Sequence, residues 1–99
     1  MLHIVNKSPH QTGSLASCLR MALPGHAVLL IEDGVYAATT GSPLEAHLSN
    51  ADSPVRVYAL KPDLDARGMA SRALANVTLV DYGGFVDLVA EHSASNSWL

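Results

Sequence analysis

The sequence predicts an α/β domain with an open, mainly parallel sheet of four or five strands and helices on both faces. Short apolar runs alternate with segments of helical periodicity along the 99 residues, which is typical of parallel sheets. The run Ala27–Ile31 is continuously apolar, as in a central strand covered on both faces. Asp33-Gly34 follow it as a turn, in which Gly34 is expected to supply a positive φ. Residues 1–99 are long enough for a single domain and leave no room for a second.

The first part of the chain is expected to supply a strand and a helix. Leu2–Val5 is a short apolar strand, and a polar segment ending in Pro9 closes it. After a polar loop, Ser14 can cap a helix that runs to about Leu23, where Pro24-Gly25 end it. Its apolar positions form one stripe that packs on the sheet: Leu15, Cys18, Leu19, Ala22 and Leu23.

The rest of the chain continues the alternation. The expected elements are a return over one face of the sheet at Val35–Thr39, a helix at Leu44–Ser49, a strand at Val55–Leu60, a short helix at Pro62–Arg67, a strand at Val77–Val80 and a last helix capped by Asp81. Met69–Asn76 fits either a helical turn or a loop. The last helix has the apolar stripe Tyr82, Phe85, Val86 and Val89. Trp98-Leu99 is expected to dock as a short edge strand or against a neighbouring chain.

The composition bounds the partners and the compartment. With 48% hydrophobic and 15% charged residues, the chain is apolar for its size, which favours burial against a partner chain. The net charge of −3 and the absence of a basic run argue against direct nucleic-acid binding. A single cysteine, the lack of a leader pattern and the short apolar runs favour a cytoplasmic protein that does not cross a membrane.

Most catalytic and cofactor motifs are missing from the sequence. No two histidines have helical ligand spacing and no C-x-x-C is present, so we expect neither a metal site nor a dithiol. No G-x-S-x-G motif indicates a hydrolase. The loop Ser8–Ser14 joins a strand to a helix start and is rich in hydroxyls. It fits an ordinary capped turn or, alternatively, a cradle for a flavin or nucleotide phosphate; no bound cofactor is expected.

Cys18 is the one residue with intrinsic nucleophilic chemistry, and its position allows two interpretations. Its place on the apolar stripe of its helix predicts a small, buried hydrophobic side chain. Near a helix start, with Lys7 and His10 in the preceding loop, it could instead have a lowered pKa and act as a thiolate. The helix dipole adds little here, because Cys18 lies about four residues past Ser14.

Several segments together resemble the DsrH/TusB family of sulfur-relay proteins. They are the opening LHIVNKSP, SLASCL at 14–19, LLIEDGVYAA at 29–38, VYALKPDLDARG at 57–68, VDYGGFVDL at 80–88 and the ending SWL. Each piece is common, but their order and spacing are specific. The resemblance implies a DsrE-like fold and a heterohexamer with two homologous partners, one DsrE/TusD-like and one DsrF/TusC-like.

The resemblance also implies a function. Cys18 matches the cysteine that DsrH-like members have in the first helix, so it is the candidate persulfide carrier, although the main carrier in such complexes is on the DsrE or TusD subunit. The complex would serve tRNA 2-thiouridine synthesis or dissimilatory sulfur oxidation. The alternative is a purely structural subunit of the complex. Self-association is expected when the chain is expressed alone. Asp33, Tyr36 and Trp98 are candidate interface residues, whereas Asp63, Asp65 and Arg67 are expected on a solvated helix face.

Overall fold

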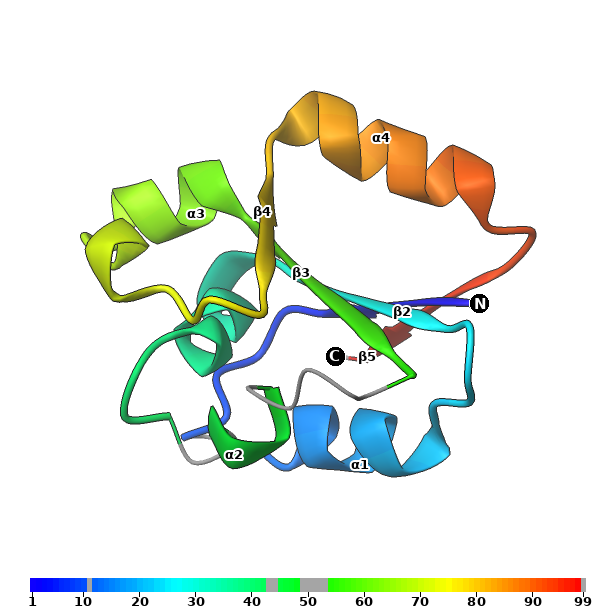
Figure 1. Ribbon diagram of the computed structural model, residues 1–99, viewed down its shortest axis with the longest axis horizontal. Coiled ribbons are helices and arrows are strands. Elements are labelled where there is room, and N and C mark those ends of the chain that lie inside the picture. The colour runs from blue at the N-terminus through cyan, green and yellow to red at the C-terminus, as the bar shows by residue number, and fades with distance from the viewer. Residues whose placement is uncertain (11, 43–44, 49–53, 99) are drawn as a thin grey trace.

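A computed structural model describes residues 1–10, 12–42, 45–48 and 54–98. Its strands form one parallel sheet in the order β4-β3-β2-β1-β5 (Figure 1). The five strands are β1 (Leu2–Val5), β2 (Ala27–Leu30), β3 (Arg56–Leu60), β4 (Thr78–Val80) and β5 (Ser95–Trp98). The predicted fold class, an open parallel sheet with helices on both faces, is confirmed.

The central strand is β2, as its apolar run predicts. Ala27 is 3% exposed and the other three residues have no exposure. Leu2 pairs with Ala27 on one side, and Arg56 pairs with Ala27 on the other, so the three strands start in register. A strand with both edges paired and both faces covered has no contact with water, which is why every residue in it is apolar.

Helices cover the two faces unequally (Figure 1). The helices are α1 (Ser14–Met21), α2 (Glu45–Leu48), α3 (Lys61–Ala66) and α4 (Tyr82–Glu91), with two 3-10 helices, η1 (Glu32–Ala38) and η2 (Ala70–Arg72). Side chains of α1, η1 and α3 share one apolar cluster with β1, β2 and β3. On the opposite face α4 contributes Leu88 and the half-buried Phe85 to a smaller cluster. The second face of the sheet is therefore less completely covered than the first.

The first helix is shorter than predicted. Gly13 takes the N-cap position, so Ser14 is already helical, and the backbone is extended at Ala22. Because the helix ends at Met21, Leu23 leaves the apolar stripe and is 61% exposed. The prediction is wrong for Leu23 and confirmed for Leu15 and Cys18, which are buried.

The remaining elements lie close to their predicted positions. The helix expected at Leu44–Ser49 is found as α2, and its predicted first and last residues lie outside the described residues. The undecided segment Met69–Asn76 contains the helical turn η2. None of the helices in the described part of the chain is long and apolar enough to cross a membrane.

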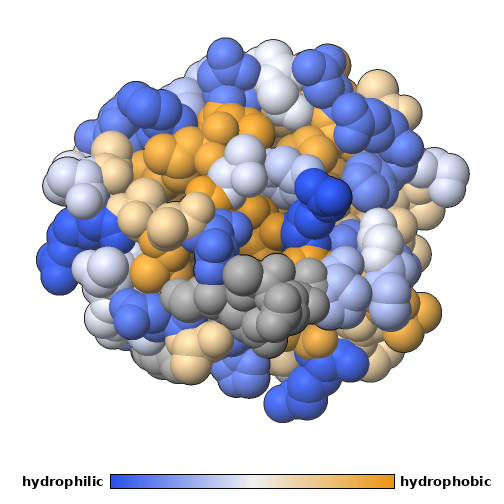
Figure 2. Space-filling model, in the orientation of Figure 1, coloured by the Kyte–Doolittle hydropathy of each residue, from blue (hydrophilic) through white to orange (hydrophobic). Residues whose placement is uncertain are grey.

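The last helix has the predicted cap, but of its predicted stripe only Phe85 packs against the sheet and the other three residues face outward. Asp81 accepts a hydrogen bond from the Gly84 N–H at 2.8 Å, which confirms the cap. Tyr82, Val86 and Val89 are 62%, 65% and 43% exposed, so they do not pack on the sheet. Figure 2 shows further apolar surface in the middle of the same view, below α4 and beside β4, with hydrophilic residues around it.

Candidate functional site

Cys18 lies in the middle of α1, on the side turned toward the sheet. Its side chain has no solvent exposure and belongs to the apolar cluster of α1, η1, α3 and the central strands. Removal from water penalises the charged form, so burial raises the pKa of the thiol to about 11. At pH 7 about one thiol in ten thousand is then ionised. In this conformation the thiol is neither accessible nor nucleophilic.

The loop before α1 does not activate Cys18. Lys7 and His10 are exposed, and the one cause that acts on the pKa of Cys18 is desolvation. Of the two interpretations of Cys18, the geometry therefore favours the small buried hydrophobe over a thiolate activated by this loop. Cys18 is the fifth residue of α1, beyond the first turn in which the helix dipole stabilises an anion.

The loop Ser8–Ser14, the alternative phosphate cradle, bonds to itself. The N–H of His10 donates to Ser8 Oγ at 3.2 Å, and the N–H of Thr12 donates to the Ser8 carbonyl at 3.2 Å. The N–H of Ser14 donates to Thr12 Oγ1 at 3.4 Å. A phosphate would need such backbone donors for its own oxygens. Their internal partners favour the ordinary capped turn.

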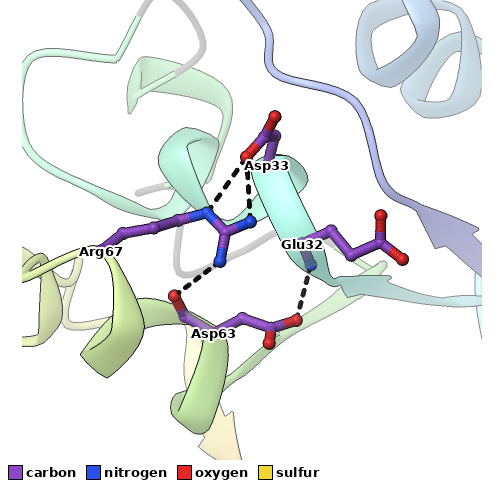
Figure 3. A network of polar contacts seen from close by, with 4 residues as sticks. All are labelled: Glu32, Asp33, Asp63 and Arg67. Carbon is purple, nitrogen blue, oxygen red and sulfur yellow. Dashed lines mark hydrogen bonds and ion pairs between the residues drawn. The ribbon is translucent and has the colours of Figure 1, made fainter.

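The carboxyl edge of the sheet carries a polar network between η1 and α3 (Figure 3). Arg67 donates from Nε and Nη2 to Asp33 Oδ1 at 3.1 and 2.9 Å, and from Nη1 to the Asp63 carbonyl at 3.1 Å. Asp63 Oδ2 accepts from the Glu32 N–H at 2.6 Å. The Arg67 guanidinium carbon lies 5.9 Å from the centre of the Tyr36 ring, within cation–π range. Asp33 and Tyr36, both predicted interface residues, thus share one arginine.

The backbone turn in η1 has a different cause from the predicted one. The positive φ, 49°, is at Glu32, whose N–H is held by Asp63. A Cβ at Gly34 would lie 2.3 Å from the Val5 carbonyl oxygen, which itself accepts from the Ile31 N–H at 3.0 Å. Gly34 is therefore required because η1 passes close to the end of β1, not because its own φ is positive.

Trp98 is the last residue of β5, which pairs with β1 as a short edge strand, so the predicted docking is confirmed for Trp98, while Leu99 lies outside the described residues. Its indole Nε1 donates to His3 Nδ1 at 3.1 Å. His3 Nε2 lies 3.0 Å from His26 Nδ1, which also accepts from the Leu23 N–H at 3.2 Å. His3 is buried, and its pKa is lowered by desolvation, then by the nearby His26 and the amino terminus.

The His3–His26 contact is the part of the site that sequence reasoning missed. The two residues are 23 positions apart, and we expected the histidines to be scattered. The signal was the alignment of two predicted strands, in which Leu2 pairs with Ala27. His3 comes directly after Leu2, and His26 comes directly before Ala27, so the two histidines lie near each other. Such a contact becomes visible only when the register is known.

Two surface hollows lie near these groups, and Cys18 lines neither. One, of about 260 Å³, lies between α1 and α2 and is lined by Ala16, Leu19, Arg20 and His47. The other, of about 340 Å³, is lined by Gly25, His26, Ala27, Pro54, Arg56, Tyr58, Glu91 and His92. Within the described ranges, no group of three or more His, Cys, Asp or Glu side chains is placed to hold a metal ion.

Comparison with known proteins identifies the family. The family described as DsrH like protein matches residues 7–95 of the chain. The chain belongs to the DsrH/TusB family. Proteins named TusB from Shigella flexneri and from Escherichia coli (strain K12 / DH10B) are 41% and 40% identical to it. In each case the similarity covers 99% of this chain and 100% of the relative.

Solved structures show the same fold. The crystal structure of ychN from E. coli superposes with a TM-score of 0.79 over 97% of both chains, at 18% identity. The protein MTH1491 from Methanobacterium thermoautotrophicum gives a TM-score of 0.71 over 97% of this chain and 95% of its own, at 25% identity. At these identities the likeness concerns the arrangement of the sheet and helices. The DsrH/TusB assignment rests on the sequence matches.

Proposed function

We propose that this DsrH/TusB member, one domain over residues 1–99, is a subunit of a cytoplasmic sulfur-relay complex. The observation that carries the proposal is the full-length similarity to proteins named TusB. The complex would pass persulfide sulfur toward tRNA 2-thiouridine or, alternatively, in dissimilatory sulfur oxidation. The acidic balance of the chain supports contact with proteins instead of tRNA.

Cys18 is the group proposed to handle sulfur. Its thiolate would attack the outer sulfur of a donor persulfide, R–S–SH, forming Cys18–S–SH and releasing the donor thiolate R–S⁻. The step moves one sulfur atom and needs no external oxidant or reductant. Because the thiol is buried with a pKa of about 11, the step requires a conformation in which the Cys18 side chain is exposed to solvent.

The proposed partners are a DsrE/TusD-like and a DsrF/TusC-like subunit in a heterohexamer. Two surfaces support association. The outer stripe of α4 exposes the apolar side chains of Tyr82, Val86 and Val89 to water. Burying them against another chain would be favourable. The carboxyl edge offers the half-exposed carboxylate of Asp33 beside Tyr36. Neither residue belongs to the two apolar clusters of the chain.

The second candidate function is a structural subunit, and the burial of Cys18 favours it. A side chain with no exposure and a raised pKa behaves as a small hydrophobe. In that case the chain would serve the complex by completing an interface, and another subunit would carry the sulfur.

The experiment that separates the two is intact-mass spectrometry after incubation with a persulfide donor protein. A gain of one sulfur atom that reductant reverses, and that a Cys18→Ser variant lacks, is the result expected for a carrier. The variant must first be shown to assemble with the partner subunits. If no sulfur is gained even with both partners present, Cys18 is core packing and the structural function holds.

A further inference from the structure

The burial of Cys18 raises the question of which element can uncover it. α1 contacts both β1 and β5, and Trp98 of β5 packs against the apolar cluster that contains Cys18. We propose that β5 is a strap over Cys18: when β5 leaves the edge of β1, the thiol becomes reachable from solvent. The biological use of this strap rests on the proposed sulfur-carrier function, although the opening itself does not.

The position of β5 makes it the least costly strand to release. It is an edge strand that pairs with β1 alone, and it is one end of the sheet order. Ser95, Asn96 and Ser97 are exposed, so they contribute no apolar burial. Elements with few buried side chains open locally at lower free energy than the core does. The other edge, β4, is separated from β1 by β3 and β2, whereas α1, the helix of Cys18, contacts β1 and β5.

Trp98 is the anchor of the strap. It pairs with Val5, and side chains of paired residues in a parallel sheet lie on the same face. Val5 belongs to the cluster around Cys18, and Trp98 is half-buried against that cluster. The single tryptophan of the chain is thus both the main apolar contact of β5 and a neighbour of the cluster that hides the thiol.

Trp98 is held by a chain of hydrogen bonds through His3 to His26, and one tautomer of His3 satisfies both of its bonds. An indole Nε1–H can only donate, so His3 Nδ1 must be unprotonated to accept it at 3.1 Å. Neutral His3 then has its proton on Nε2 and donates to His26 Nδ1 at 3.0 Å. His26 Nδ1 also accepts from the Leu23 N–H, which agrees with this assignment. The C-terminal strand is therefore tied through His3 to the segment that leads into β2.

The test measures how fast iodoacetamide alkylates Cys18 in the folded, full-length chain, followed by intact mass. Trp98→Phe keeps an aromatic ring on β5 and removes the donor. Loss of this one half-buried hydrogen bond is expected to increase the alkylation rate about fivefold. Trp98→Ala, which also removes the packing, is expected to increase it further.

The matched control is Leu88→Val, which trims the apolar cluster on the other face of the sheet, under α4. Urea unfolding gives the free energy of unfolding of each variant. From it follows the alkylation rate that global unfolding alone would produce. With a β5 strap, Trp98→Phe accelerates alkylation beyond that rate, and Leu88→Val does not. If both variants follow global unfolding alone, or if Trp98→Phe leaves the rate unchanged, the strap is disproved.

The two proposals fail in different ways. If Trp98→Phe accelerates alkylation but the wild-type chain takes up no sulfur from a persulfide donor, the strap stands and the carrier function falls. If the wild-type chain takes up sulfur but alkylation is indifferent to Trp98, the carrier function stands and Cys18 is uncovered by another route. If Trp98→Ala is too unstable to fold, the test rests on Trp98→Phe compared with Leu88→Val.

Discussion

Among the glycines of the chain, Gly34 has the least room for a side chain. A Cβ there would meet the Val5 carbonyl oxygen at 2.3 Å, and that oxygen is fixed by its bond to the Ile31 N–H. Gly34→Ala is therefore expected to lower the free energy of unfolding by about 3 kcal/mol, the upper part of the range for overpacking. Urea denaturation measures the change.

Gly13 supplies the matched control for that substitution. Nothing lies within 4 Å of a Cβ placed on it, and its φ is −92°. At an N-cap, Gly13→Ala is expected to cost only a few tenths of a kcal/mol, roughly the difference between these residues there. Equal effects at the two glycines would mean that η1 does not approach β1 as closely as described.

His3 makes stability depend on pH. Its pKa in the folded chain is lowered from 6.5, by burial first and then by His26 and the amino terminus, the titratable groups that affect it. The unfolded chain binds a proton more readily, so folding is favoured by neutral His3. The contribution is complete above pH 6.5 and is lost as the pH falls from there through the lower folded pKa. The free energy of unfolding, followed by urea titration between pH 8 and pH 5, should decrease accordingly.

His3→Asn separates this effect from other titrating groups. Asn Oδ1 can still accept from the Trp98 indole, whereas the side chain no longer titrates. The pH dependence below 6.5 is expected to flatten in the variant, at the expense of the bond to His26. An unchanged slope would assign the loss of stability in acid to other residues.

Single residues differ in how far the sequence predicts them. The burial of Cys18 followed from helical periodicity, because its neighbours on the stripe lie one turn away. Arg67 could not be placed in this way, since its partner Asp33 is 34 positions away on another element. Leu23 continued the helical period, but the backbone ends the helix before reaching it.

Among the elements, η1 and α3 are joined by a bond network whose strength can be measured. The Arg67 side chain is 23% exposed and its partner Asp33 is 52% exposed, so solvent weakens the ion pair. Arg67→Lys loses the forked geometry and the contact with Tyr36. We expect a loss of about 1 kcal/mol in the free energy of unfolding, smaller at high salt.

The pair Lys61–Asp65 within α3 serves as the comparison. Its side chains are 54% and 48% exposed, at i,i+4 spacing. Asp65→Asn should cost no more than about 0.5 kcal/mol in the same urea measurement. If Asp65→Asn lowers the free energy of unfolding as much as Arg67→Lys does, the network between η1 and α3 stabilises the fold no more than an ordinary surface ion pair.

For α4 the sequence predicts which residues share a face, but not where that face points. The period places Tyr82, Phe85, Val86 and Val89 on one stripe; in the structure Phe85 is half-buried against the sheet, whereas the other three are exposed. Periodicity is a property of the helix alone, whereas burial depends on what packs beside it. A helix that serves an assembly can turn its apolar stripe away from its own sheet.

At the scale of the whole molecule, the outward stripe of α4 predicts association. Val86→Glu places a charge on the most exposed member of the stripe. In the isolated chain it is expected to change the free energy of unfolding by less than about 0.5 kcal/mol, because the site is at the surface. Self-association, or assembly with the partner subunits, should fall clearly in sedimentation velocity.

Ser71→Glu introduces the same charge on η2, at an exposed position outside that stripe. It is expected to leave the sedimentation profile unchanged. If both variants dissociate equally, net charge governs the association; if neither does, the interface lies elsewhere, for instance at the carboxyl edge with Asp33 and Tyr36.

The order of the strands was only partly predictable. Alternation of strands and helices requires parallel neighbours, which fixes the direction of each strand. It does not fix which strand lies at an edge, and β5 has three exposed polar residues that carry no apolar pattern. Only Trp98 marked this segment, through its size.

The pairing of β1 with β5 also determines how the chain must fold. His3 and Trp98 are 95 positions apart, so this contact closes almost the largest loop that the chain can form. Contacts of such high sequence separation form late, because their entropy of closure is compensated only after the rest of the sheet exists. Until β5 pairs with it, the backbone groups along the outer edge of β1 are unpaired and can bind another strand. At high protein concentration, β5 of a second copy can take that place, so refolding is expected to yield domain-swapped dimers alongside monomers.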